Sequence, residues 1–219
     1  MARSINNRAL KPAIAIIVDG EDEIWYISKA KEYYPNDVLK RTKIKPEIFQ
    51  HKKCKDLFQY AKQKIEEGYA PVILILDLDT IRNCPEELNA FKVLYSQFIN
   101  AKYSSRPGKS SKWMKDLMVL INNPCLEFWY LLHFKRTTRF YDCYNSLRSD
   151  LKSVKVFADY EKSEKFYFNS PDIFQRLGGL DGLAIARSNS DKPGFVLEDC
   201  DCCGISEMAQ LFDLFDKLA

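Results

Sequence analysis

Acidic side chains follow the ends of three apolar segments. They are Asp19 after residues 12–18, Asp77 and Asp79 at the end of the run that starts at 71, and Glu127 shortly after residues 117–121. If these runs are parallel strands, their carboxyl ends meet at one edge of a sheet, where ligands bind. Several carboxylates in one crevice repel one another unless cations join them, and hard divalent cations take oxygen ligands. The spacing therefore predicts a site for Mg²⁺ (or Mn²⁺) and phosphoryl chemistry.

Glu127 lies in the most apolar helix that the sequence predicts, "NPCLEFWYLLHF". On a helical wheel this segment has no polar face, which is typical of a buried helix. A buried carboxylate costs several kcal/mol, roughly, unless it has a partner. We expect that partner to be the metal site, and the alternative is a lysine or backbone amides from the C-terminal part. His133 and Glu23 are expected to support the site, His133 as a packed or hydrogen-bonded neighbour.

The elements that must position these residues alternate along the first part of the chain. We expect strands over 12–18, 44–49, 71–77 and 117–121, and helices over 21–34, 54–68, 85–100 and 124–134, the last with Asn123 as N-cap and Pro124 in its first position. This alternation predicts an α/β domain over residues 1–135, with a parallel sheet flanked by helices. Residues 136–219 show helical patterns and no strand series, which predicts a mostly helical C-terminal appendage packed on the sheet domain.

The composition is that of a globular protein. Of 219 residues, 46% are hydrophobic and 29% charged, and the net charge is +3. No segment approaches the ~20 apolar residues of a membrane span, and no signal peptide is visible, so we expect a cytoplasmic protein. The seven cysteines are expected to be reduced. The cluster "CDCC" (200–203) is a poor zinc motif, because only His51 and His133 exist as partners.

A basic run spans residues 40–55, where Glu47 is the single acid. Its candidate phosphate-contacting residues are Lys40, Arg41, Lys43, Lys45, Lys52 and Lys53. Such a run suits a nucleic-acid backbone, and its ordinary alternative is a solvated surface.

Two motifs point to other chemistry. "RPGKSSK" (106–112) contains Gly-Lys-Ser, but a P-loop needs a glycine where Tyr103 stands, and a strand follows it rather than a helix. "DLDTI" (77–81) is similar to the nucleophile strand of haloacid-dehalogenase-type phosphatases, and "FVLED" (195–199) could imitate their later acidic motif. Such a phosphatase stays an alternative.

The chain resembles the TOPRIM fold, in which an acidic residue and glycine follow the first strand and D-x-D follows a later one. It resembles more closely the RloB-like TOPRIM proteins of bacterial defence loci, with the pattern E-G-x-T-E-x-x-Y, then D-x-D, then N-P-C-x-E-x-W-x-x-x-H-F. The matching segments are "DGEDEIWY" (19–26), "DLD" (77–79) and "NPCLEFWYLLHF" (123–134). Asp19 and Asp22 depart from the pattern, where the family has glutamate and threonine.

The resemblance implies a TOPRIM/Rossmann-like fold and a Mg²⁺-dependent nuclease, a hydrolase of phosphodiester bonds in RNA, such as tRNA, or in DNA. It implies that Asp77 and Asp79 hold metal, that Asp19 completes the site or activates water, and that Glu127 is a further ligand or base. It also implies an antiviral effector of abortive infection, paired with an ATPase encoded nearby; an oligomer is possible. The alternative is a catalytically weak regulatory or binding subunit of a defence complex.

Overall fold

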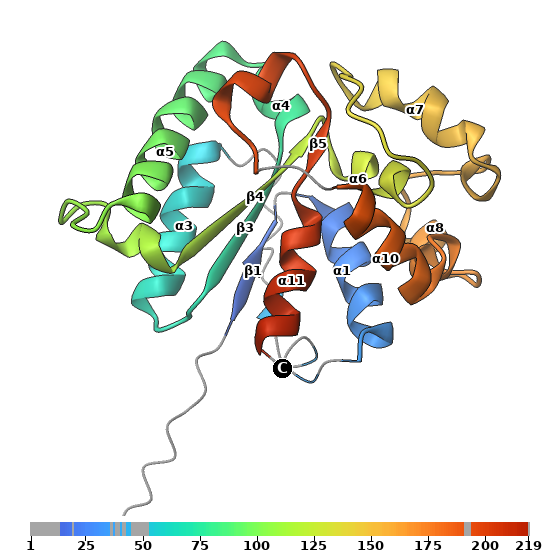
Figure 1. The fold of residues 1–219 in the computed structure, drawn as a ribbon, viewed down its shortest axis with the longest axis horizontal. Coiled ribbons are helices and arrows are strands. Elements are labelled where there is room, and N and C mark those ends of the chain that lie inside the picture. Colours follow the sequence, from blue (N-terminus) through green and yellow to red (C-terminus); the bar gives the residue numbers. More distant parts are fainter. Residues whose placement is uncertain are drawn as a thin grey trace, which may run out of the picture.

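The computed structural model describes residues 14–18, 20–35, 37, 40, 43–44, 53–190 and 194–218. Among these residues, five strands form one sheet in the order β2-β1-β3-β4-β5 (Figure 1). The strands are β1 (Ala15–Ile17), β2 (Lys43–Ile44), β3 (Val72–Asp77), β4 (Leu117–Asn123) and β5 (Ile205–Ser206). β1, β2, β3 and β4 pair in parallel, and β5 pairs antiparallel with β4. The predicted α/β fold with a parallel sheet is confirmed for β1 to β4, and β5 adds an antiparallel strand that was not predicted.

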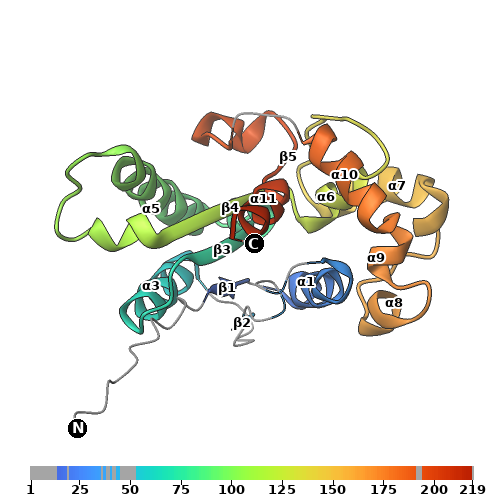
Figure 2. The ribbon, with the colours of Figure 1, turned by 60° about the horizontal axis from the view of Figure 1, so that its bottom comes forward.

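Helices cover both faces of this sheet (Figure 2). Those of the first part are α1 (Glu21–Tyr33), α3 (Cys54–Glu66), α4 (Leu78–Arg82), α5 (Pro85–Tyr103), the 3₁₀ turn η1 (Lys112–Asp116) and α6 (Leu126–Leu132). Successive strand residues point to opposite faces, so Leu74 packs with α3 and α5, while Ile73 and Ile75 pack with α1 and α6. Burial on both faces explains why the central strands read as continuous apolar runs.

The C-terminal part is mostly helical, as predicted, and it also returns to the sheet. Its elements are α7 (Tyr144–Ser153), η2 (Lys155–Phe157), α8 (Glu164–Phe168), α9 (Ile173–Arg176), α10 (Gly179–Asn189), η3 (Leu197–Asp201), β5 and α11 (Met208–Leu218). Phe212 and Phe215 of α11 share one core with Ile73 and Ile75 of β3. The sheet domain and the appendage are thus joined by a strand and by a core, and a boundary at residue 135 stays a prediction.

The start of α6 differs from the expectation. The helix begins at Leu126 with Cys125 as N-cap, so Pro124 is not its first residue and Asn123 is not its cap. The physical reason is that β4 continues through Asn123, whose amide donates to the carbonyls of Asp199, Cys200 and Cys203 in the returning segment. Asn123 therefore fastens the segment around η3 to the end of β4.

The glycine-rich segment after α9 contains a helix that the sequence pattern does not predict. α10 buries Leu183 and Ala186, and a Cβ atom at Gly182 would lie 1.7 Å from the carbonyl oxygen of Leu177. Glycine is required here because the backbone of α10 packs directly against the preceding turn. Within the described residues, no helix is both long enough and apolar enough to span a membrane.

Candidate functional site

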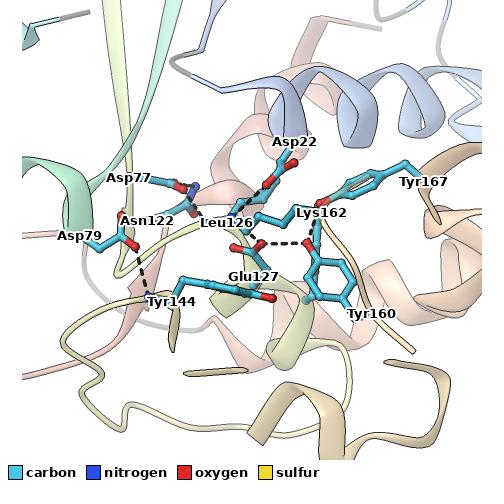
Figure 3. A network of polar contacts seen from close by, with 11 residues as sticks. Asp22, Asp77, Asp79, Asn122, Leu126, Glu127, Tyr144, Tyr160, Lys162 and Tyr167 are labelled. Carbon is cyan, nitrogen blue, oxygen red and sulfur yellow. Dashed lines mark hydrogen bonds and ion pairs between the residues drawn. The ribbon is translucent and has the colours of Figure 1, made fainter. Parts of the chain in front are cut away.

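Asp77 is the last residue of β3 and lies at the carboxyl edge of the sheet, in register with Asn122 of β4. Its Oδ1 accepts a hydrogen bond from Asn122 Nδ2 at 3.1 Å, and its Oδ2 accepts one from the backbone N–H of Leu126 at 3.1 Å. The end of β4 and the start of α6 thus both donate to this carboxyl group, which fixes its orientation (Figure 3).

Asp79 reaches the same edge from a helix. Two residues apart in an extended chain, Asp77 and Asp79 would point the same way, but α4 begins at Leu78, so Asp79 does not continue the strand. The chain turns there because pairing with β4 ends at Asp77, and the N–H of Asp79 donates to the carbonyl of Pro124 at 3.0 Å. Asp79 Oδ2 accepts a hydrogen bond from the N–H of Tyr144, the first residue of α7, at 3.2 Å.

Glu127 lies in the first turn of α6 and is fully buried, as is every residue of that helix. Its Oε1 accepts hydrogen bonds from the hydroxyl of Tyr160 and from the ammonium of Lys162, both at 2.8 Å. Its Oε2 is buried, and it has no hydrogen-bond partner among the described residues. The lysine from the C-terminal part that stood as the alternative partner is therefore present, and one oxygen of the carboxylate is left over.

Lys162 links this group to the first helix. Its Nζ lies 3.0 Å from Asp22 Oδ2 and 4.5 Å from the ring centroid of Tyr144. Figure 3 shows the lysine reaching between Asp22 and Glu127, with Asp77 and Asp79 on the other side of the Glu127 carboxylate. The ammonium therefore compensates two carboxylates that come from α1 and α6, far apart in the sequence.

Three buried tyrosines extend the network behind Glu127. Tyr160 OH lies 2.8 Å from Tyr167 OH, and Tyr130 OH donates to Tyr167 OH at 3.2 Å. Burial raises the pKa of each of these phenols well above its usual value, and the negative charge of Glu127 adds to that effect. The tyrosines therefore stay protonated, and Tyr160 holds Glu127 in place as a hydrogen-bond donor.

The site carries more negative than positive charge among the described residues. Burial raises the pKa of Asp77 well above its usual value, and the neighbouring carboxylates Glu23, Asp79 and Glu127 raise it further, while Lys162 opposes them. Burial also raises the pKa of Asp79, against the effect of the backbone amides. This excess of negative charge is the electrostatic condition for binding a cation.

The donor set fits a hard divalent cation. Carboxylate oxygens are the ligands that Mg²⁺ prefers, and it usually keeps several waters besides one or two carboxylates. The unpartnered Oε2 of Glu127 offers such an oxygen. The oxygens of Asp77, Asp79 and Glu127 are not gathered within 4.8 Å of one another, so water molecules would have to complete the coordination.

Three other residues were predicted to belong to the site or to support it. Glu23 is buried in the first turn of α1 and acts electrostatically on Asp77. His133 is buried apart from the carboxylates, where its Nδ1 lies 3.0 Å from the carbonyl of Trp129 and its ring packs edge-on against the indole. Asp19 lies outside the described residues.

The structure describes the predicted phosphate-contacting run only in part. Lys40 is exposed and lies 3.9 Å from Asp37, and Lys53 is exposed at the start of α3. Lys43 lies in β2, where only the backbone is described, and Arg41, Lys45 and Lys52 lie outside the described residues.

Sequence reasoning missed the residues that meet Glu127. Lys162 and Tyr160 lie in the turn between η2 and α8, where no periodic pattern or motif marks them. Asp22, which the sequence marks only as a departure from the family pattern, lies in the first turn of α1 and faces Lys162. Each is recognisable only from its position in space.

The cysteine cluster forms a second group of potential ligands. Among the described residues, Asp199, Cys202 and Cys203 are the one set of three such residues whose ligand atoms lie within 4.8 Å of one another. Burial and the hydrogen bond from Cys203 Sγ to Asp199 raise the pKa of the Cys203 thiol to about 12. A protonated thiol is a poor metal ligand.

The fold and the site define an α/β protein with a cluster of carboxylates at the carboxyl edge of a mostly parallel sheet. The family described as RloB-like protein matches residues 14–210. The match covers most of the chain, including β5 and the start of α11, and the chain therefore belongs to the RloB-like family. No curated protein and no solved structure matches the chain.

Proposed function

We propose that the chain is a Mg²⁺-dependent nuclease, which hydrolyses phosphodiester bonds in RNA, such as tRNA, or in DNA. One observation carries the proposal. Asp79 and Glu127 act electrostatically on Asp77 at the carboxyl edge of the sheet, and one buried oxygen of Glu127 has no hydrogen-bond partner among the described residues. A carboxylate cluster in which one oxygen is buried without a partner favours a bound cation over a purely structural arrangement.

The residues would divide the work as follows. When bound, Mg²⁺ would neutralise charge on the phosphate and lower the pKa of a water molecule. Asp77 and Asp79 would hold the cation, and their backbone and amide donors keep them oriented. Glu127 would offer Oε2 as a further ligand or as the base that takes a proton from the attacking water. Tyr160 would keep that carboxylate in position.

The wider proposal rests on the family. The resemblance to RloB-like proteins of defence loci supports an effector of phage defence, paired with an ATPase encoded nearby. The exposed Lys40 and Lys53 support contact with a nucleic-acid backbone, since both are open to solvent.

A regulatory or binding subunit with weak catalysis is the second candidate. The contact of 2.8 Å between Lys162 and Glu127 favours it, because an internal ammonium already compensates this carboxylate without a metal ion. The two candidates differ in whether the cluster needs a divalent cation to act.

The test compares the full chain with its Asp77→Asn variant and, as a matched control, with Asp181→Asn, which changes an exposed aspartate of α10. End-labelled single-stranded RNA, tRNA, single-stranded DNA and duplex DNA are incubated with Mg²⁺, Mn²⁺ or EDTA. We expect metal-dependent cleavage that falls at least about a hundredfold in Asp77→Asn, as for other groups that stabilise transition-state charge, and persists in Asp181→Asn. Equal cleavage by Asp77→Asn would refute the proposed site.

A second measurement does not depend on catalysis, so it also applies if the chain needs a partner to cleave its substrate. Titration calorimetry with Mn²⁺ should show binding by the native chain and by Asp181→Asn, and little binding by Asp77→Asn. Metal binding without cleavage would favour the regulatory candidate. A phosphomonoester such as p-nitrophenyl phosphate, included as a substrate, would reveal a phosphatase.

A further inference from the structure

Lys162 is the cationic side chain in direct contact with the carboxylate cluster in the described part of the chain. It lies in the turn between η2 and α8, and its Nζ is 2.8 Å from Glu127 Oε1 and 3.0 Å from Asp22 Oδ2. Its side chain is 39% exposed, whereas that of Glu127 is fully buried. The ammonium thus enters the cluster from the solvent side.

Lys162 is paired with two carboxylates at once. Its Nζ lies within ion-pair distance of both Glu127 and Asp22. Asp77 and Asp79 accept their hydrogen bonds from uncharged donors. Lys162 acts on them only through longer-range electrostatics. Among these three carboxylates, Glu127 is therefore the one at which the ammonium and a metal ion would compete most directly.

We propose that Lys162 is a competitor built into the site, which occupies Glu127 in the metal-free protein and must give way when a divalent cation binds there. The inference rests on the proposed metal site at Asp77, Asp79 and Glu127, and it assigns to Lys162 the control of metal affinity.

Electrostatics favours displacement over shared occupancy. Mg²⁺ binds carboxylate oxygens at about 2.0–2.1 Å, so a cation on Glu127 would lie close to an ammonium that is 2.8 Å from the same carboxylate. Like charges at such separations repel by several kcal/mol, even at an effective dielectric constant of about 20. Asp22, at 3.0 Å, offers the displaced ammonium a second carboxylate, so Lys162 can move away without losing its counter-charge.

The first experiment measures Mg²⁺ affinity by titration calorimetry for the full chain, Lys162→Met and Lys165→Met. Methionine keeps much of the length of the stem and removes the charge, and Lys165 is an exposed lysine of α8 that serves as the matched control. Removing a neighbouring positive charge should raise the affinity of Lys162→Met about tenfold or more, while Lys165→Met keeps the native value. A merely structural role for Lys162 predicts the opposite sign, because a disturbed site binds more weakly.

The second experiment uses the native chain, so it does not depend on the folding of a variant. Lysines are labelled with an amine-reactive ester in EDTA or in Mg²⁺, and the extent at each position is measured by mass spectrometry. Displacement predicts faster labelling of Lys162 in Mg²⁺, with Lys165 unchanged as the internal reference. Unchanged or slower labelling of Lys162 in Mg²⁺ would overturn the inference.

The outcomes separate this inference from the proposed function. Native metal binding that depends on Asp77, together with equal or weaker binding by Lys162→Met, would overturn the competition and leave the metal site standing. Binding by Lys162→Met alone would support the competition in its strongest form. If neither protein binds Mg²⁺ at this cluster, both the competition and the metal site fail.

Discussion

Replacing Asp77 with asparagine should stabilise the metal-free protein at neutral pH. Burial and the neighbouring carboxylates Glu23, Asp79 and Glu127 raise the pKa of Asp77 in the folded protein. The unfolded chain releases this proton near its ordinary pKa, about 3.9. Between the two pKa values the folded state binds more protons, so native stability falls as the pH rises. The side chain of asparagine does not ionise, so the variant does not lose stability as the pH rises.

The magnitude follows from the hydrogen bonds and the linkage. Both oxygens of Asp77 face donors, from Asn122 and from the N–H of Leu126. A protonated carboxyl and an amide each offer one acceptor oxygen, so the variant and the native chain should be about equally stable at acid pH. The advantage of Asp77→Asn should then grow by up to about 1.4 kcal/mol per pH unit and level off above the folded pKa. Each kcal/mol corresponds to roughly 2–4 °C in Tm for a chain of this size.

Bound metal should reverse this ranking. A ligand at a hundred times its Kd stabilises the folded state by about 2.7 kcal/mol, and Asp77→Asn should lose most of that gain. The assay is urea denaturation followed by circular dichroism, between pH 3.5 and 7.5, in EDTA and in Mg²⁺, with Asp181→Asn as the control. A variant that is less stable by the same amount at every pH would refute the reasoning, because the hydrogen bonds would then outweigh the charge.

Three further outcomes are expected. Tyr160→Phe removes a hydrogen bond to the carboxylate of Glu127 and should lower the free energy of unfolding by about 1.5–3 kcal/mol in urea denaturation; an unchanged midpoint would contradict the network. Burial lowers the pKa of His133 to about 4, so native stability should fall by about 3 kcal/mol as the pH drops from above 6.5 to below 4. The His133→Phe variant should not lose stability in this way. Parallel stability-against-pH profiles of the native chain and the variant would contradict the prediction. Charge reversal at Lys52 and Lys53 should reduce the log–log salt slope of nucleic-acid binding by roughly 0.7–0.9 per lost contact, and an unchanged slope would return this run to plain solvated surface.

The position of the carboxylates was predictable because the rule behind it is topological. Parallel strands end at one edge, so Asp77 and the segment that carries Glu127 had to approach one another once the strands were recognised. The same rule gives no information on the counter-charge. Lys162 stands in an irregular turn, and only the folding of the C-terminal part brings it to Glu127. The roles of these residues in metal binding and catalysis stay predictions.

The differences in the fold have local causes. Pro124 looks like the first residue of a helix, but hydrogen bonding in β4 extends through Asn123 and delays the start of α6 until Leu126. The strand β5 is only two residues long, which is too short for a period of two to be recognised in sequence. In α10 the glycines obscure the helical pattern, although one of them is required by close packing against Leu177.

The contact between Glu127 and Lys162 also sets an order of events during synthesis. The ribosome releases α6 first, and Tyr160, which meets the same carboxylate, follows 33 residues later. Until that turn emerges, burying Glu127 would leave its charge without a partner, so we expect α6 to remain undocked on the nascent chain. The pairing of β4 with β5 then has to wait for a residue 84 positions beyond Asn122. The counter-charge and hydrogen-bond donor of Glu127 are therefore in place only after Lys162 has left the ribosome.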